Sequence, residues 1–209
     1  MYPNGRRLIL IACAVGAELE FFHPVPHVEM LVTGVGPIEA AAGVSRALAT
    51  SAYELVINAG IAGAFPGAAE IGDGVVVSEE FCEICLETGQ SIALPAGQRV
   101  VDRALSDLHL VDSLVELGYR RLLGLTVSKV TATDATAQRL VAHGVGVESM
   151  EGFAVLRAAE IAGVPAIEVR GISNLVGDRG RSQWNFAHGV RGLERILTSL
   201  LALLGTADG

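Results

Sequence analysis

Apolar runs without a polar face alternate along this chain with segments of helical periodicity. The run 8–15, Leu-Ile-Leu-Ile-Ala-Cys-Ala-Val, carries no polar side chain, which is typical of a strand in a sheet covered on both sides. Strands are predicted over residues 8–15, 28–33, 55–58, 75–78, 122–127 and 166–171. Helices are predicted over residues 38–50, 102–117, 151–162 and 184–204. The alternation predicts one layered α/β domain over residues 1–209, with a largely parallel sheet.

The balance of charged and apolar residues excludes several classes of protein. Fifteen Lys and Arg stand against 23 Asp and Glu, giving a net charge of −8, so we expect no nucleic-acid partner. Hydrophobic residues make up 51 % of the chain, which excludes a disordered protein. Arg6 and Arg7 precede the run 8–15, but only five apolar residues lie before Cys13. That is too few for a secretory signal, and the run is too short to span a membrane, so no membrane association is expected.

The three cysteines, Cys13, Cys82 and Cys85, are too sparse for a disulfide framework, which indicates a cytoplasmic protein. Cys82 and Cys85 have the spacing of a metal or redox pair. A zinc site needs two further ligands, however, and a redox pair needs a βαβ setting, so we interpret them as ordinary thiols on or beside a strand. The five histidines show no HExxH spacing, and no metal is expected.

Two glycine pairs raise the question of a nicotinamide cofactor. Gly34-x-Gly36 has no third glycine, and Gly60-x-x-Gly63 also departs from the dinucleotide-binding pattern, so no cofactor is expected. Gly34 and Gly36 remain either turn glycines or part of an anion cradle. Residues 58–63, Asn-Ala-Gly-Ile-Ala-Gly, are predicted to form a glycine turn after the third strand.

Polar residues follow several of the predicted strands, where ligands bind in open α/β sheets. Glu18 follows the first strand, Glu151 begins the helix 151–162, and Ser173 and Asn174 follow the late strand. Each has an ordinary alternative explanation: Glu18 as a helix-start carboxylate, Glu151 as a favourable charge in the first turn of a helix, and Asn174 as a common loop residue.

Taken together and in order, these segments resemble the purine nucleoside phosphorylase and nucleosidase superfamily. The segments that carry the resemblance are Ala17-Glu18-Leu19, Thr33-Gly-Val-Gly36, Asn58-Ala-Gly-Ile-Ala-Gly63, Ile71-Gly-Asp73, Glu148-Ser-Met-Glu151-Gly and Val169-Arg-Gly-Ile-Ser-Asn174. They resemble the branch of the methylthioadenosine/S-adenosylhomocysteine nucleosidases, and within it the futalosine hydrolase family. The resemblance implies a three-layer α/β/α sandwich with a central mixed, largely parallel sheet.

The resemblance also assigns roles to residues. Glu18 orients the attacking water and acts as general base, whereas Glu151 grips the ribose hydroxyls and Met150 packs against the sugar. The first glycine loop contributes Gly36 to substrate binding. The remaining implied contacts form the wall around the base and its N7 edge: Ile61, Ala62, Gly63, Ser173 and Asn174.

The region that covers the 5′ substituent is implied to contain Trp184 and Phe186, at the start of the last predicted helix. A hydrophobic staple or a contact between subunits explains these two aromatic residues equally well. Relatives form dimers whose partner chain lines the 5′ pocket, so we expect a homo-oligomer. Arg179 and Arg181 are candidates, by charge alone, for holding a carboxylate at the far end of the substrate.

Hydrolysis, rather than phosphorolysis, follows from missing residues. The bacterial phosphorylases of the superfamily carry arginines in the first glycine loop, but residues 14–17 are Ala-Val-Gly-Ala. Ile61 lies where a phosphate-binding hydroxyl would be expected. The water-handling carboxylate Glu18 is present instead.

Asn174 departs from the pattern of the methylthioadenosine nucleosidases, which have an aspartate that protonates N7 of adenine. Asparagine donates hydrogen bonds but releases no proton. A 6-oxopurine leaves more easily than adenine, so we expect futalosine to be cleaved to hypoxanthine and dehypoxanthinyl futalosine, as in the alternative menaquinone pathway. The alternatives are an adenine-releasing methylthioadenosine/S-adenosylhomocysteine or aminodeoxyfutalosine nucleosidase, and a purine-binding homologue that has lost activity.

Overall fold

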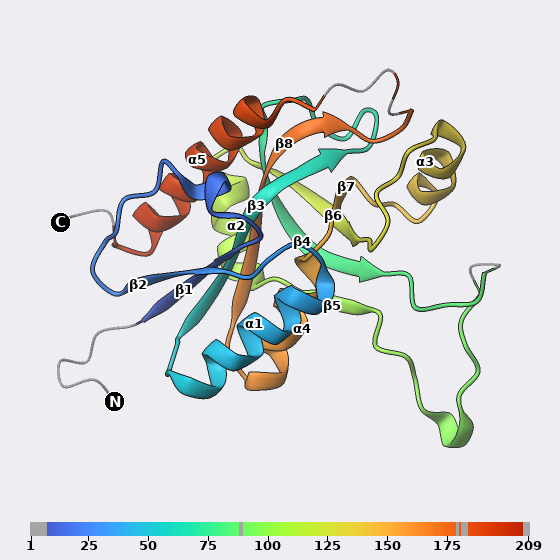
Figure 1. The fold of residues 1–209 in the computed structure, drawn as a ribbon, viewed down its shortest axis with the longest axis horizontal. Coiled ribbons are helices and arrows are strands. Elements are labelled where there is room, and N and C mark those ends of the chain that lie inside the picture. Colours follow the sequence, from blue (N-terminus) through green and yellow to red (C-terminus); the bar gives the residue numbers. More distant parts are fainter. Residues whose placement is uncertain (1–7, 88–89, 179, 181–183, 207–209) are drawn as a thin grey trace.

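The computed structural model describes residues 8–87, 90–178, 180 and 184–206. Its elements follow one another along the chain as drawn in Figure 1. In order they are β1 (Ile9–Cys13), the 3₁₀ helix η1 (Gly16–Leu19), β2 (Val28–Val32), α1 (Pro37–Thr50), β3 (Leu55–Ala64), β4 (Gly74–Cys82), the 3₁₀ helix η2 (Pro95–Gly97), β5 (Arg103–Leu105), α2 (Leu108–Glu116), β6 (Arg120–Thr126), α3 (Asp134–Val141), β7 (Val147–Ser149), α4 (Gly152–Ala162), β8 (Ala166–Leu175) and α5 (Phe186–Leu203).

The eight strands form one mixed sheet that closes on itself. Its linear order is β2-β1-β3-β7-β6-β4-β5, and β8 pairs with both β3 and β4. The strands β3, β7, β6, β4 and β8 therefore form a closed, barrel-like ring, from which β1 and β2 extend at β3. Five of the strand pairs are parallel, and the pairs β3–β7, β4–β5 and β4–β8 are antiparallel.

Closure is possible because β3 is long enough to have three partners. Its first half pairs with β1, its last two residues pair with β7, and β8 runs along the opposite edge from Val56 to Ala64. The predicted mixed, largely parallel sheet is thus confirmed. The plain three-layer sandwich is wrong, because long-range pairing of β8 with β4 curls the sheet into a ring.

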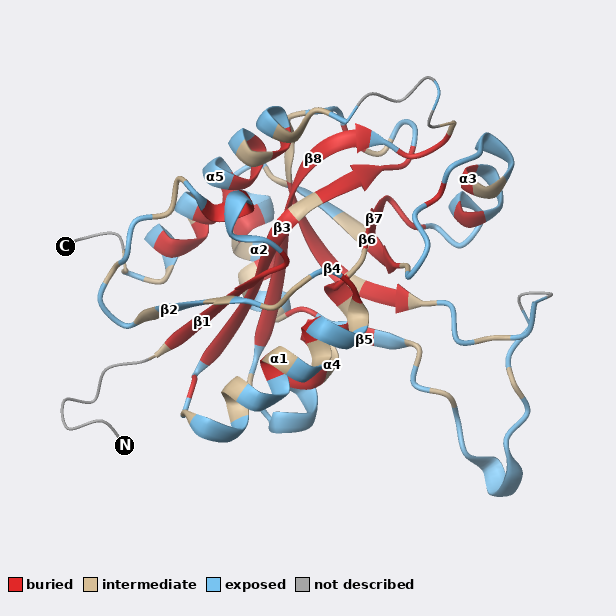
Figure 2. Ribbon diagram, viewed as in Figure 1, coloured by how far each residue is buried: buried red, intermediate tan, exposed pale blue. Residues whose placement is uncertain are grey.

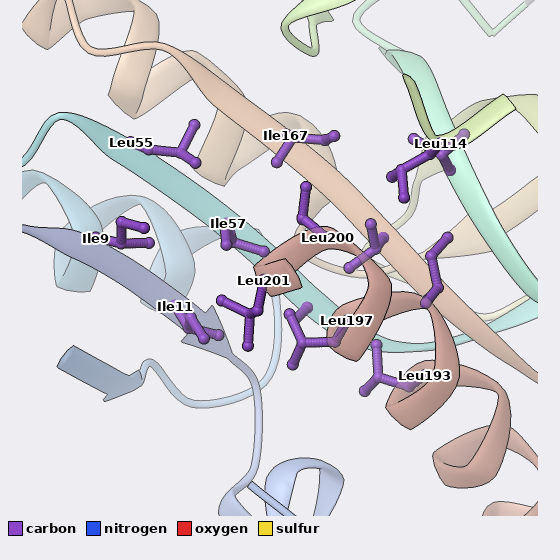
Figure 3. Close-up of a cluster of buried hydrophobic side chains, with 14 of the residues drawn as sticks. Ile9, Ile11, Leu55, Ile57, Leu114, Ile167, Leu193, Leu197, Leu200 and Leu201 are labelled. Atoms are coloured by element: carbon purple, nitrogen blue, oxygen red, sulfur yellow. The ribbon is translucent and has the colours of Figure 1, made fainter. Parts of the chain in front are cut away.

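Helices cover the sheet on two sides, and each side has its own apolar cluster. Buried side chains of α5, α2, β1, β3 and β8 pack together on one side, as Figure 3 shows for Ile11, Ile57, Leu197 and Leu201. Those of α1 and α4 pack against β1 and β3 on the other side. Figure 2 shows the central strands buried and the helices exposing their outer faces. Among the described helices, none has the length and apolar character that a membrane span would need.

The buried first strand predicted over 8–15 is confirmed over a shorter range, Ile9–Cys13, in which all five residues are buried. The helix predicted over 102–117 is wrong in its first part. Arg103–Leu105 pairs with β4 as β5, and the carboxylate of Asp107 then caps α2 by accepting from the amides of His109 and Leu110. The short elements α3 and β7 were not predicted.

The glycine turn predicted after residue 58 is also wrong, because β3 continues without a break to Ala64. Likewise β8 continues to Leu175, so Ser173 and Asn174 lie inside a strand rather than after it. The glycines of β3 serve close approach instead of a turn: a Cβ on Gly60 would lie 2.5 Å from Nη1 of Arg170.

Candidate active site

A cavity of about 380 Å³ lies where β1, β3, β6, β7 and β8 reach their carboxyl ends. This position agrees with the general location of ligand sites in α/β proteins. Ten of the eleven residues that the resemblance assigns to the site line it: Glu18, Ile61, Ala62, Gly63, Met150, Glu151, Ser173, Asn174, Trp184 and Phe186. The eleventh, Gly36, lies directly behind Glu151.

Glu18 is buried, and its carboxylate is fixed by three backbone amides. One oxygen accepts from Ile61 N at 2.9 Å, and the other accepts from Ala14 N and Val15 N, both at 3.1 Å. Burial raises the pKa of Glu18 above its ordinary value of 4.5, and the charge of Glu151 adds to this, although the amide bonds and Arg170 act in the opposite direction. A carboxylate offers about four lone pairs, so one acceptor position remains for a ligand or a water.

Glu151 lies at the N-terminus of α4, but its carboxylate does not cap that helix. One oxygen accepts from the backbone amide of Gly36 at 3.0 Å, and the other lies 3.9 Å from Nη1 of Arg170. The interpretation of Glu151 as a mere helix-start charge is therefore insufficient. Gly36 has a φ of 100°, a conformation that favours glycine, and it presents its amide to Glu151 rather than lining the cavity.

Arg170 is a buried cation beneath the two carboxylates. Its Nε donates to Glu168 at 2.7 Å, and its Nη2 donates to Oγ of Ser149 at 3.3 Å. Burial alone would lower the pKa of Arg170, but the neighbouring carboxylates of Glu168, Glu151 and Glu18 outweigh it and raise the pKa above its ordinary value. The guanidinium is thus permanently charged, and Gly60 leaves the space in which it approaches Glu18.

The register of β3 and β8 shifts between Ala62 and Gly63, where Ala62 pairs with Ile172 but Gly63 pairs with Asn174. Ser173 is the extra residue of this bulge. A bulge changes the direction of side chains that would otherwise alternate, which explains why the consecutive residues Ser173 and Asn174 both line one cavity.

The Asn174 amide is held by neighbours on both sides. Its Oδ1 accepts from Oγ of Ser173 at 3.1 Å, and its Nδ2 donates to the carbonyl of Leu175 at 3.2 Å. The amide nitrogen has a second N–H, which remains available to a ligand. A Cβ on Gly63 would lie 2.9 Å from this nitrogen, so glycine at 63 is required for the approach.

The mouth of the cavity is aromatic. Trp184 stacks edge-on against Phe186 with ring centroids 5.8 Å apart, and its Nε1 donates to Oγ of Ser173 at 3.0 Å. Trp184 is nevertheless 62 % exposed. A surface of this kind suits either a cover over a substrate substituent or a contact with a second subunit, and both interpretations stay open.

The charge of the cavity is one-sided. Three carboxylates line it, from Glu18, Glu148 and Glu151, whereas none of the described residues that line it is Lys or Arg. Glu148 is already occupied, since its two oxygens accept from the amide and the hydroxyl of Thr131. An anion such as phosphate would find no cation to bind in this wall.

Sequence reasoning assigned no role to Arg170, Glu168 or Glu80, although a signal was present. Glu168 and Arg170 are charged residues two positions apart in an otherwise apolar run, so they point to the same face of β8. Charged residues in a buried strand need partners. Glu168 and Arg170 are partners of each other, and Arg170 also faces the carboxylates of the site. Glu148 belongs to one of the segments that carry the family resemblance, but the sequence predicts no role for it.

Two other expectations concern the surroundings of the site. Arg179 and Arg181 lie outside the described residues. Cys82 is the last residue of β4, and Cys82 and Cys85 are free thiols. Within residues 8–87, 90–178, 180 and 184–206, no group of three or more His, Cys, Asp or Glu side chains could hold a metal ion.

The closed mixed sheet and the cavity at its strand ends can now be compared with known proteins. Residues 23–202 match the phosphorylase superfamily, and the chain belongs to this family. The resemblance inferred from the sequence motifs is thereby confirmed.

The relatives narrow the family further. A futalosine hydrolase of Thermus thermophilus is 33 % identical over 185 residues, covering 85 % of this chain and 82 % of that protein. A futalosine hydrolase of Streptomyces coelicolor is 36 % identical over 188 residues, covering 84 % and 79 %. The fold matches the crystal structure of the Streptococcus pneumoniae methylthioadenosine/S-adenosylhomocysteine nucleosidase in complex with 8-aminoadenine, with a TM-score of 0.78 and 22 % identity over 93 % of this chain and 98 % of that one.

Proposed function

We propose that this chain hydrolyses the N-glycosidic bond of futalosine and releases hypoxanthine and dehypoxanthinyl futalosine, a step of the alternative menaquinone pathway. The chain belongs to the phosphorylase superfamily, and its identity to two futalosine hydrolases makes it an N-glycosyl hydrolase. The choice of futalosine as substrate is the proposal. The observation that carries it is one cavity lined by Glu18, Glu151 and Asn174, without a lining cation among the described residues.

Cleavage of a purine N-glycosidic bond builds positive charge on the sugar and negative charge on the base. Carboxylates around the sugar and hydrogen-bond donors at the base therefore stabilise the transition state more than the ground state. The cavity offers the two kinds of group on different elements: the carboxylates of Glu18 and Glu151 from η1 and the start of α4, and the Asn174 amide from β8.

Water is the nucleophile that the cavity favours. The three lining carboxylates would repel phosphate, and Arg170 is buried behind them, where it is engaged with Glu168. Glu18 keeps one acceptor position after binding three amides, and this position suits a water molecule whose proton it removes. A pKa raised above that of an ordinary glutamate makes Glu18 a better base near neutral pH.

In this proposal Glu151 accepts hydrogen bonds from two ribose hydroxyls and faces the developing cation. The Gly36 amide and the Arg170 guanidinium hold its carboxylate from behind, which is the kind of support that keeps a binding group in one orientation. Met150 precedes it in the cavity wall, where it supplies apolar contact to the sugar.

Asn174 supports hypoxanthine as the leaving base. Its free N–H donates to N7 or O6, which are both acceptors in a 6-oxopurine. An amide supplies no proton, and a 6-oxopurine needs none to leave because its negative charge spreads to O6. The adenine-releasing alternative requires an acid at this position, and Asn174 cannot serve as one.

The experiment is a panel of three nucleosides, futalosine, inosine and methylthioadenosine, with detection of the released base with and without inorganic phosphate. We expect hypoxanthine from futalosine at a rate that phosphate does not change. Release of adenine from methylthioadenosine with futalosine left intact would support the adenine-releasing alternative. A rate that requires phosphate, with a ribose 1-phosphate product, would make the chain a phosphorylase. No turnover of any of the three would support the inactive homologue.

A further inference from the structure

Two carboxyl groups that the proposed reaction does not use are completely buried behind the cavity. Glu80 on β4 and Glu168 on β8 both have no exposed surface, and their strands are antiparallel neighbours. Oε2 of Glu80 accepts from the hydroxyl of Thr126 at 2.7 Å. Oε1 of Glu168 accepts from Nε of Arg170 at 2.7 Å.

The remaining oxygen of each carboxyl lacks a hydrogen-bond donor among the described residues: Oε1 of Glu80 and Oε2 of Glu168. Both of these oxygens lie beside Gly152, and the two carboxyl groups are within hydrogen-bonding reach of each other. A Cβ on Gly152 would be 2.5 Å from the Glu80 oxygen and 2.6 Å from the Glu168 oxygen. The absence of a side chain at Gly152 therefore leaves the space that both carboxyls occupy.

We propose that Glu80 and Glu168 share one proton, carried by Glu80, and that the pair positions Arg170 beneath Glu151 and Glu18. Two adjacent ionised carboxylates in a dry interior would repel each other and leave both free oxygens unsatisfied. One proton between them forms an O–H···O⁻ hydrogen bond that satisfies both. The guanidinium of Arg170 favours the negative charge on Glu168, so the proton belongs on Glu80.

The surroundings of the pair agree with this assignment. The charged or titratable groups that face Glu80 are Glu168 and Arg170 of β8 and Cys82 of its own strand. The neighbouring β6 contributes the hydroxyl of Thr126 and α4 contributes Gly152, both uncharged. Burial raises the pKa of Glu80 well above its ordinary range, and the charge of Glu168 raises it further.

The pair matters to the site because Glu168 is the strongest anchor of Arg170. With Nε bound to Glu168 and Nη2 bound to Ser149, the guanidinium presents Nη1 toward Glu151. With the proton on Glu80, the pair presents only the single negative charge of Glu168 to Arg170. The positive charge of Arg170 therefore also stabilises the carboxylates of the cavity. Glu80 and Glu168 are thus positioning residues.

The first test measures the free energy of unfolding against pH by urea denaturation, which needs no substrate. The folded protein holds the Glu80 proton at pH values where an unfolded glutamate has lost it. This contribution to stability is fully present below about pH 4.3, the value for an unfolded glutamate, and is lost as the pH rises through the raised pKa of Glu80. Glu80→Gln keeps a donor toward Glu168 and an acceptor for Thr126 without a titrating proton.

We therefore expect the stability of Glu80→Gln to fall less steeply with rising pH than that of the wild type. Glu80→Met, which fills the space but cannot donate, should be less stable than Glu80→Gln. The shared proton would be overturned if the free energy of unfolding fell equally steeply with pH in the wild type and Glu80→Gln. It would also be overturned if Glu80→Gln were destabilised as much as Glu80→Met. Should Glu80→Met fail to fold, the pH dependence of unfolding in Glu80→Gln and the wild type still tests the shared proton.

The second test concerns positioning and rests on the proposed function. Glu168→Gln removes the charge that anchors Arg170, and we expect kcat/KM for futalosine to fall about tenfold or more, while Glu80→Gln stays within about threefold of the wild type. A Glu168→Gln enzyme with unchanged kcat/KM would overturn the positioning role. If the wild type itself leaves futalosine intact, the proposed function fails, and the pH dependence of unfolding still tests the shared proton.

Discussion

Replacing Glu18 by glutamine separates the proposed catalytic role of this carboxylate from its structural role. The carboxylate accepts three backbone amides, one on Oε1 and two on Oε2. A glutamine side chain has one oxygen, which can replace Oε2 and keep the bonds from Ala14 and Val15. Its NH₂ group then faces the amide of Ile61, and two donors meet where a hydrogen bond was.

The structural cost follows from this count. One buried amide loses its acceptor, which costs about 1–3 kcal/mol, and each kcal/mol lowers Tm by about 2–4 °C in a domain of this size. The kinetic cost is larger. Loss of a general base reduces kcat by about 10²–10⁴, because glutamine cannot take the proton of the attacking water. KM should change little, since the proposed contacts of Glu151 and Asn174 with the substrate remain.

The assay is release of hypoxanthine from futalosine under saturating substrate, together with a thermal unfolding curve of the same preparation. Glu20→Gln is a matched control, because Glu20 is exposed and lies two residues away, so kcat and Tm should both stay at the wild-type values. A Glu18→Gln enzyme with near-normal kcat would refute the general-base role, and a loss of kcat explained by incomplete folding would show in the unfolding curve.

Two further predictions concern the carboxylates and the glycine between them. The proposed general base must be ionised, so kcat/KM should fall as the pH drops through the pKa of Glu18, which is raised above the ordinary value of 4.5. Glu151→Gln removes a charge that raises this pKa, so it should move the acid side of the pH profile to lower pH and also reduce kcat/KM. An unmoved profile would contradict the electrostatic coupling between Glu151 and Glu18. Gly60→Ala should lower both Tm and kcat/KM, because its Cβ would lie 2.5 Å from Nη1 of the buried Arg170. The control is Gly43→Ala in α1, whose Cβ would have contacts of 3.5 Å and beyond, so it should be neutral or stabilising by about 0.5–1 kcal/mol. Equal effects of the two substitutions, measured by thermal unfolding and kinetics, would contradict the argument that Gly60 is needed for the close approach of Arg170.

The sequence predicted most strands, and most of the residues that it named for the site line one cavity, but it did not predict how the strands close. Apolar runs such as 8–15 identify buried strands because both faces of the sheet are covered. Gly60 and Gly63 were interpreted as a turn, since glycine in sequence indicates a turn more often than an approach by a distant residue. Their actual neighbours, Arg170 and Asn174, lie more than a hundred positions away and become visible only in three dimensions.

The pairing of β8 with both β3 and β4 is equally non-local, so the barrel-like closure could not be read from periodicity. The start of α2 is a different case, because Asp107 is a good N-cap residue and could have marked the helix boundary. Glu80 and Glu168 are visible in the sequence as charges within apolar strands, but only the structure shows that both carboxyls lie beside Gly152.

Asn174 is the residue on which the choice of leaving base depends, and Asn174→Asp tests that choice most directly. In the structure Nδ2 faces the carbonyl of Leu175 and Oδ1 faces the hydroxyl of Ser173. An ionised aspartate would bring an oxygen against the Leu175 carbonyl, so this environment favours the protonated form, which can donate to N7 of a 6-aminopurine. The ionised form would repel O6 of hypoxanthine.

The measurement is kcat/KM for futalosine and for its 6-amino analogue, in the wild type and in Asn174→Asp. We predict that the wild type prefers futalosine and that the aspartate variant loses activity on futalosine while gaining relative activity on the amino analogue. A ratio that the substitution leaves unchanged, or a wild type that already prefers the amino substrate, would contradict the assignment of hypoxanthine as the leaving base.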